Sequence, residues 1–242
     1  MEDKLTNYIA IHQPNFLPWA GYFLKMNDSD TFVFHDHVEI SKRGPTRRAK
    51  IASNKNGMYQ SQWLTVPLKK HSDFTLIKDL EIDWEKNWTS KHLVKIYEEY
   101  RLMQQFSSVF NHIETWYNES REFRLLSEVN IHFIKRIMSY LDIKKELVIS
   151  SDLSVYGKGN DYNFHIVKHL NGTHYICGKG SDKYQDDKLF SVNHIQLQRQ
   201  DALAILGDRL PEFKSYINLS IIDLLMRVEL TILKSVISTS KN

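Results

Sequence analysis

The sequence has very little cysteine and no long hydrophobic run, and both absences limit where the protein can work. Its 242 residues include one cysteine, Cys177, so no disulfide can form within the chain and a reducing compartment is expected. The opening MEDKLTNYIAIHQP has no apolar stretch that resembles a signal peptide, and no window approaches the ~18 apolar residues of a membrane span. We therefore expect a soluble, cytoplasmic protein.

The sequence also lacks an excess of charge of one sign. It contains 32 Lys and Arg and 29 Asp and Glu, and the resulting net charge of +3 is too small to indicate a nucleic-acid partner. Hydrophobic residues make up 42% and charged residues 25%, which suffices for an ordinary globular core. Because repeats, low-complexity tracts and linkers are missing too, we expect a single domain over residues 1–242.

The first 38 residues have the pattern of a βαβ unit. Residues 8–12 (YIAIH) and 31–38 (TFVFHDHV) are apolar and β-branched or aromatic, which is typical of buried strands. Between them, QPNFLPW predicts a loop because proline cannot donate to a strand ladder, and AGYFLKMNDS predicts a helix. This order predicts parallel strands joined by a right-handed crossover.

The rest of the chain extends the same architecture. A basic loop (SKRGPTRRAKI) and a strand (YQSQWLTVPL) precede a helical insertion at about residues 84–141. ELVISS, YNFHIVKHLN and HYICG predict a second βαβ unit, HIQLQRQ another strand, and residues 219–237 one closing helix. The predicted class is α/β, with a mostly parallel sheet, flanking helices and this insertion.

Several blocks carry a family resemblance from residue 8 to residue 225. They read IHQPNFLPWAGYFLKM, DTFVFHDHVEISKR, WLTVPL, WTSKHLVKIYEEY, SSDL, HYICGKGSDKY and LSIIDLL. In this order they resemble the WbqC-like family, whose members are typically found in gene clusters for O-antigen and other surface polysaccharides. The resemblance implies a role in lipopolysaccharide O-antigen biosynthesis.

Two positions depart from the family pattern. Gly44 to Arg48 replace a tryptophan and a polar stretch that ends in Asn-Arg, so Arg48 is retained while an aromatic residue is lost. Cys177 stands where serine is common, which argues against an essential hydroxyl nucleophile at this position. A buried, unreactive thiol is the favoured interpretation of Cys177.

The loop after the first strand holds the first group of candidate site residues. In parallel α/β sheets ligands bind at the carboxyl ends of the strands, where His12, Gln13 and Asn15 are expected. His12 and Gln13 are candidate catalytic residues, and Asn15 is a candidate substrate-binding residue. Trp19 and Tyr22 are candidate substrate contacts, although both also suit the core.

A second group lies at the ends of other predicted strands. Asp36 is a candidate catalytic carboxylate. The candidate substrate-binding residues, chiefly for phosphate, are Lys42, Arg48, Lys179, Asp182 and Tyr184. The basic segment 42–48 is expected to be an exposed loop, and a solvated surface is the alternative to a phosphate site. All these strand-end residues are expected to line one cleft.

Residues 35–37 and Asp223 are expected to have structural roles. His35 and His37 share one face of a strand while Asp36 takes the other, so a third metal ligand is missing and no metal site is predicted. Asp223 interrupts the apolar face of LSIIDLLM, and we expect it to face solvent or to anchor a basic residue.

The favoured hypothesis is an enzyme, a transferase that modifies a nucleotide-linked amino sugar by N-acyl or aminoacyl transfer with amide formation. His12 would take the amine proton, and the identity of the acyl or aminoacyl donor is left open.

The first alternative is a nucleotidyltransferase or ligase with a HIGH-type loop, which needs ATP and Mg²⁺. Its loop histidines are replaced here by Trp19-Ala20-Gly21-Tyr22. The second alternative is a non-catalytic module that binds sugar nucleotides. Apart from the ATP and Mg²⁺ of the first alternative, no cofactor is expected. A stable nucleic-acid partner is not expected either.

Overall fold

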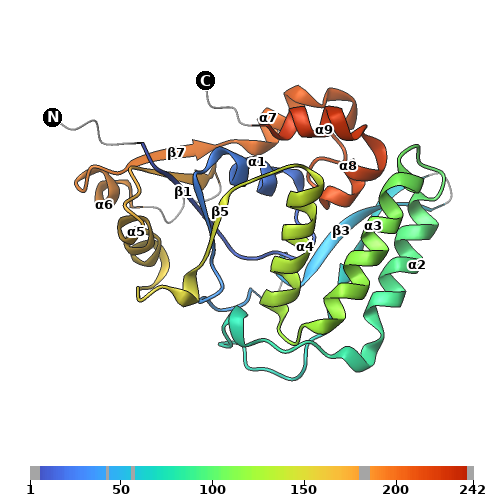
Figure 1. Ribbon diagram of the computed structural model, residues 1–242, viewed down its shortest axis with the longest axis horizontal. Helices are drawn as coiled ribbons and strands as arrows, with labels where there is room; N and C mark the ends of the chain where they lie inside the picture. The colour runs from blue at the N-terminus through green and yellow to red at the C-terminus, as the bar shows by residue number, and fades with distance from the viewer. Residues whose placement is uncertain (1–5, 42–43, 56–57, 180–185, 239–242) are drawn as a thin grey trace.

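The computed structural model describes residues 6–41, 44–55, 58–179 and 186–238. Helices cover much of this part of the chain, around a set of short strands (Figure 1). In chain order the elements are β1 (Tyr8–His12), α1 (Ala20–Asp28), β2 (Thr31–Phe34), β3 (Arg48–Lys55), β4 (Met58–Thr65), η1 (Ile77–Asp79), η2 (Trp84–Lys86), α2 (Trp88–Tyr100), α3 (Phe106–Glu119), η3 (Ser120–Glu122), α4 (Leu126–Tyr140), β5 (Glu146–Ile149), η4 (Ser150–Asp152), α5 (Gly159–His169), β6 (His174–Gly178), α6 (Asp187–Ser191), β7 (Gln196–Gln200), α7 (Ala202–Arg209), η6 (Pro211–Phe213), α8 (Ile221–Arg227) and α9 (Leu230–Ile237).

The main sheet is parallel and has the strand order β5-β2-β1-β6-β7. The predicted first βαβ unit is confirmed, because β1 pairs with β2 in parallel and α1 connects them. β5 and β6 are also parallel members of this sheet, but β2 and β1 lie between them, so the connection through α5 passes over two strands. The predicted α/β class with a mostly parallel sheet is therefore confirmed.

Each face of the sheet is covered by its own hydrophobic cluster, since successive strand residues point to opposite faces. Ala10 and Phe32 belong to the larger cluster, which includes α1, α4, α8 and α9. Ile9, Ile11 and Val33 belong to the smaller cluster, which includes α5 and Phe190 of α6. Figure 1 accordingly shows α5 and α6 on one side of the strands, and α1 and α4 on the other.

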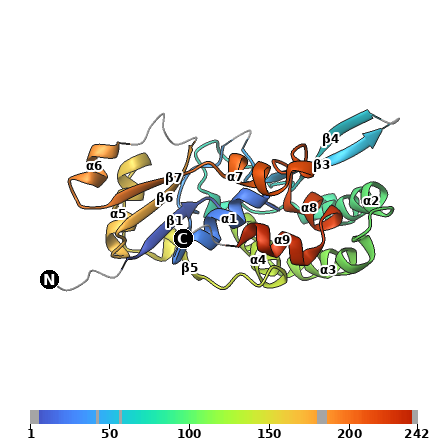
Figure 2. The same cartoon turned by 90° about the horizontal axis from the view of Figure 1, so that it is seen from above.

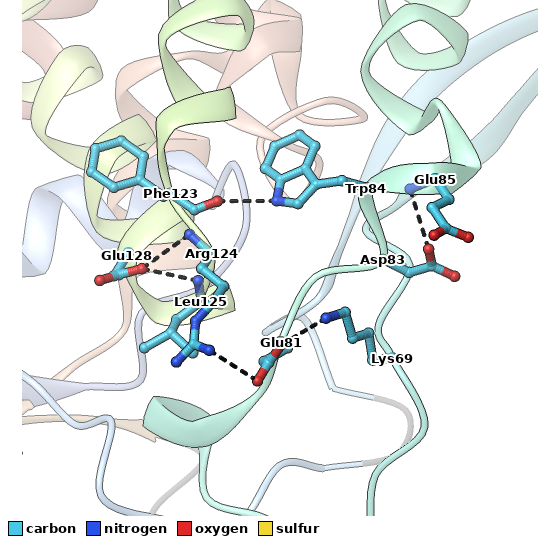
Figure 3. A network of polar contacts seen from close by, with 9 residues as sticks. All are labelled: Lys69, Glu81, Asp83, Trp84, Glu85, Phe123, Arg124, Leu125 and Glu128. Atoms are coloured by element: carbon cyan, nitrogen blue, oxygen red, sulfur yellow. Dashed lines mark hydrogen bonds and ion pairs between the residues drawn. The ribbon is translucent and has the colours of Figure 1, made fainter.

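The region predicted as a helical insertion contains α2, α3 and α4, which lie next to one another (Figure 1). A polar network fastens the segment before α2 to the start of α4 (Figure 3). Glu81 pairs with Lys69 at 2.8 Å and with Arg124 at 3.4 Å. The Glu128 carboxylate accepts from the backbone N–H of Leu125 at 2.9 Å, which caps the first turn of α4. That the chain forms a single domain stays a prediction.

Two sequence predictions about elements are wrong. The basic segment predicted as a loop continues into a strand, because Arg48 begins β3 and pairs with Thr65 at the end of β4 in an antiparallel hairpin. Its charged residues Arg48 and Lys50 hid the strand, although Ala49 and Ile51 are buried. The single closing helix is instead α8 and α9, separated where Val228 takes an extended conformation. Figure 2 shows the hairpin projecting at the end of the molecule opposite α6.

Asp223 of α8 is an anchor, as one of the two sequence-based interpretations proposed. Its side chain is 0% exposed and accepts hydrogen bonds from the Ala52 backbone N–H at 3.1 and 3.3 Å. The Arg227 Nε lies 3.9 Å from its Oδ1, and the Tyr100 hydroxyl is adjacent. Burial raises the pKa of Asp223 to about 7, with the neighbouring hydrogen bonds acting against the shift.

None of the described helices is both long and apolar enough to cross a membrane.

The raised pKa of Asp223 predicts how stability depends on pH. The folded protein keeps the proton up to about pH 7, whereas the unfolded chain releases it near its ordinary value of 3.8. The stability that this group contributes is therefore full below about pH 4, falls as pH rises to about 7, and is constant above. Each pKa unit corresponds to about 1.4 kcal/mol, so the loss is on the order of a few kcal/mol.

Urea unfolding of the wild type and of Asp223→Asn between pH 4 and 8 measures this slope. The amide cannot ionise, so the variant should lose the decline in the free energy of unfolding between pH 4 and 7. Asp142→Asn is the control, because Asp142 is exposed and pairs with Lys234, which lowers its pKa below this window. An identical pH slope in the wild type and in Asp223→Asn would contradict the assignment.

Candidate functional site

A cleft of about 490 Å³ opens at the carboxyl edge of the parallel sheet. It is formed by the ends of β1, β2, β6 and β7 together with α1, α5 and the start of α7. This is where parallel α/β proteins bind ligands, since the strand ends leave polar groups unpaired between the helices. The polar side chains that line it include His12, Gln13, Lys25, His35, Asn163, Lys179, Gln200 and Asp201.

The loop after β1 is fixed by its own hydrogen bonds. The backbone carbonyl of Gln13 accepts from the His12 Nδ1–H at 3.1 Å and from the Tyr22 hydroxyl at 3.1 Å. The Gln13 Oε1 accepts from the Thr46 hydroxyl at 3.0 Å. Because a carbonyl can only accept, the proton of His12 is assigned to Nδ1, and Nε2 keeps its lone pair.

His12 is a neutral group in this cleft. Burial lowers the pKa of His12 to about 3, and the nearby charge of Lys25 adds to the effect. An imidazole with this pKa is uncharged at neutral pH, and its one ring proton, on Nδ1, is held by the Gln13 carbonyl. His12 can therefore accept a hydrogen bond from a ligand through Nε2, but it cannot serve there as a positive charge.

Lys25 is the functional candidate that sequence reasoning missed. It lies on α1, is buried, and its Nζ donates to the carbonyl of Ile11 at 2.9 Å. Burial lowers the pKa of Lys25 to about 8, while the neighbouring Cys177 acts against this shift. Lys25 comes three residues after Tyr22 and four after Gly21, so all three lie on the face of α1 that borders the cleft. This spacing is the sequence signal that could have identified Lys25.

The end of β2 presents His35, and not Asp36, to the cleft. Asp36 is 3% exposed, and its carboxylate accepts from the hydroxyls of Ser150 at 3.0 Å and Ser151 at 2.7 Å. It fastens β2 to η4 outside the cleft. His35 Nδ1 lies 3.3 Å from the Ser150 oxygen, and burial lowers the pKa of His35 to about 4. His35 is thus a second neutral imidazole.

The rim of the cleft carries an ion pair. Lys179 follows β6, and its Nζ is 2.8 Å from the Asp201 Oδ2 at the start of α7. Both side chains are exposed to solvent, so a ligand can reach them. Asp182 and Tyr184, predicted to bind substrate in the same loop, lie outside the described residues, and so does Lys42.

Asn15 and Arg48 are placed away from the cleft. Asn15 is buried, and its Oδ1 has no hydrogen-bond partner among the residues that the structure describes. The guanidinium carbon of Arg48 lies 4.2 Å from the centre of the Trp63 ring. The expectation that Arg48 lies in an exposed loop is wrong, because strand pairing and this stacking hold it.

Trp19 and Tyr22 both line the cleft, and the position of the Trp19 ring depends on Gly21. A Cβ added to Gly21 would lie 2.2 Å from an atom of the Trp19 ring, so glycine is required for the indole to lie across the first turn of α1. Tyr22 is almost fully buried, and its ring centre is 4.8 Å from that of His12. Cys177 is buried at the end of β6 and also borders the cleft.

Metal binding has no support from the clustering of side chains. Within residues 6–41, 44–55, 58–179 and 186–238, no three His, Cys, Asp or Glu side chains are grouped so that they could hold a metal ion. His35 and His37 follow β2, and Asp36 between them is engaged by Ser150 and Ser151.

These features define a parallel α/β protein with an open polar cleft at the carboxyl edge of its sheet. The chain belongs to the WbqC-like protein family, whose sequence model matches residues 13–233. It is 26% identical over 190 residues to a protein of Mycobacterium tuberculosis (strain ATCC 25618 / H37Rv) described as "Uncharacterized protein Rv1507c", a match that covers 78% of this chain and 80% of the relative. No solved structure matches it.

The packing of Trp19 on Gly21 predicts the outcome of a double-mutant cycle. Gly21→Ala should lower the free energy of unfolding by about 1–3 kcal/mol, because the new methyl group overpacks against the indole. In a Trp19→Ala background the same substitution should cost little or even stabilise α1, since alanine favours helix over glycine. Urea unfolding of the four proteins measures the coupling.

Gly207→Ala in α7 is the matched control. A Cβ there would meet nothing closer than 3.6 Å, so this substitution should be neutral or stabilising. If Gly21→Ala cost as much with Trp19 removed as with Trp19 present, the close approach of the indole would not be the reason for the glycine.

Proposed function

We propose that the protein is a transferase that modifies a nucleotide-linked amino sugar, forming an amide by N-acyl or aminoacyl transfer in the synthesis of a surface polysaccharide. The observation that carries the proposal is that buried Lys25 and the neutral imidazole of His12 line the same cleft. The polysaccharide context comes from the resemblance to the family.

Amide formation requires a group that accepts a proton near neutral pH. The amine of the sugar attacks the carbonyl carbon of an activated acyl group, a C–N bond forms, the bond to the leaving group breaks, and the amine loses a proton. A base works best when its pKa is close to the working pH. Lys25, with a pKa of about 8, meets this condition better than His12, with a pKa of about 3.

We therefore assign to the neutral form of Lys25 the role of base, which accepts the proton that the amine loses. His12 has a different role: its Nε2 accepts an N–H of the attacking amine and so orients the nitrogen lone pair toward the acyl carbon. Gln13 is held by Thr46 and Tyr22, so its side-chain amide is positioned to contact the acyl or sugar group. These groups are fixed before the substrate arrives, which lowers the entropic cost of the reaction.

The diphosphate of the nucleotide is assigned to the rim of the cleft. Lys179 is exposed there and would exchange its contact with Asp201 for a phosphate oxygen, a charge-assisted interaction. Arg48, stacked on Trp63, is not part of this assignment.

The proposal predicts a specific pH dependence of activity. With UDP- or dTDP-linked amino sugars and a panel of acyl-CoA and aminoacyl donors, kcat/KM should rise with pH to about 8 and then level off, as Lys25 loses its proton. Lys25→Met should lower kcat by about 100-fold or more and remove this rise. Mass spectrometry of the sugar nucleotide measures the amide product.

Lys168→Met is the control, since Lys168 is an exposed lysine of α5 outside the cleft and its loss should leave kcat unchanged. Calorimetric titration with the same nucleotide sugars separates binding from turnover. Binding without transfer from any donor class would replace the transferase by a non-catalytic binding module. Pyrophosphate release that depends on ATP and Mg²⁺ would replace it by a ligase or nucleotidyltransferase.

A further inference from the structure

A second groove, of about 640 Å³, lies between the end of β4 and the start of α2. No element that lines the cleft contributes to it. The groove is lined by Trp63 and Thr65 from β4 and by Trp88 and three lysines from η2 and α2, which are Lys86, Lys91 and Lys95. Among the described residues that line it there is no Asp or Glu, so the groove is basic and aromatic.

Trp63 provides an exposed aromatic surface surrounded by cations. Its side chain is 43% exposed although the ring is large and apolar. The Arg48 guanidinium lies 4.2 Å and the Lys50 Nζ 5.9 Å from the ring centre, and the Lys95 Nζ donates to the Trp63 carbonyl at 3.2 Å. An exposed indole held in place in this way is typical of a ligand contact more than of the core.

Trp88 adds a buried hydrogen-bond donor without a partner. The residue is 3% exposed, and its Nε1 has no acceptor among the residues that the structure describes. The neighbouring Trp84, whose ring centre is 5.2 Å away, donates its own Nε1–H to the Phe123 carbonyl at 3.0 Å (Figure 3). An unpaired buried donor is costly, so the Trp88 N–H is suited to an acceptor that a ligand brings into the groove.

We propose that the β4–α2 groove is a second binding site, which takes a sugar that carries a phosphate or carboxylate group. The flat C–H face of the sugar packs on the Trp63 indole, its anionic group lies among Lys86, Lys91 and Lys95, and an oxygen accepts from the Trp88 Nε1. A volume of about 640 Å³ is in the range of small-ligand sites. Charged hydrogen bonds to the lysines fix the anion.

Single-stranded nucleic acid fits this groove less well. Such ligands require a series of aromatic faces on which successive bases stack along a basic channel. Here the Trp88 ring is buried, so the described lining of the groove offers a single exposed indole, that of Trp63, and no series of aromatic faces. The net charge of the chain, +3, also provides no strong long-range attraction for a polyanion.

Two blocks of the family resemblance, WLTVPL and WTSKHLVKIYEEY, meet at the groove. The groove therefore uses sequence that the cleft does not. It provides a place for an anionic saccharide that is separate from the cleft at the sheet edge. This inference does not depend on which reaction the cleft performs.

Saturation-transfer NMR with glucose 1-phosphate and with a hyaluronan tetrasaccharide, which carries carboxylates, tests the proposal. At least one of these probes should bind the wild-type protein, and the double variant Lys86→Ala/Lys91→Ala and the single variant Trp63→Ala should each weaken binding about tenfold or more. The control Lys168→Ala/Lys188→Ala removes the same charge from α5 and α6 and should bind normally.

Trp88→Phe provides a readout that a structural role would not give. It keeps an aromatic ring but removes the unpaired N–H, so affinity for the saccharide should fall; because the smaller ring leaves a cavity and lowers the melting temperature, affinity is compared at a temperature at which both proteins are folded. Equal binding of inorganic phosphate alone would overturn the proposal, because it would reduce the groove to an anion site. Unchanged affinity in the groove variants, or tighter binding of a ten-residue oligothymidylate than of either saccharide, would overturn it as well.

Discussion

The carbonyl oxygen of Gln13 accepts two hydrogen bonds at the point where the central strand ends, and the arrangement of the cleft depends on it. One bond, from His12 Nδ1, sets the tautomer of the imidazole, and the other, from the Tyr22 hydroxyl, ties the loop to α1. Because Lys25 is one turn further along α1, fixing Tyr22 also fixes the lysine. The strand end, the helix and the polar groups of the cleft therefore form one unit.

This arrangement places two neutral imidazoles and one lysine of lowered pKa in the same cleft. Burial acts on all three in the same direction, because it disfavours the charged form of histidine and of lysine. Lys25 starts from a much higher pKa, so only its titration is brought near neutral pH. The result is a cleft in which proton transfer is assigned to Lys25 and hydrogen bonding to His12 and His35.

Much of the fold could be predicted from the sequence, because the apolar strands and their spacing determine the parallel sheet. His12, Gln13 and Lys179 were also expected at a strand-end cleft, and they line one cleft together with the candidate substrate contacts Trp19 and Tyr22. The remainder depends on tertiary contacts. β3 was missed because its strand is stabilised by pairing with β4, Asp36 is turned to Ser150 and Ser151, and Lys25 is buried only when α1 packs on the sheet.

The pKa of Lys25 is the quantity that tests the central claim most directly. With lysine labelled by ¹³C at Cε, the chemical shift of Lys25 can be followed from pH 6 to pH 12 and assigned by its absence in Lys25→Met. The account predicts a midpoint of about 8 for Lys25. A midpoint near the ordinary value of 10.5 would contradict it, because the described lining of the cleft would then lack a group with a pKa close to neutral that could accept the amine proton.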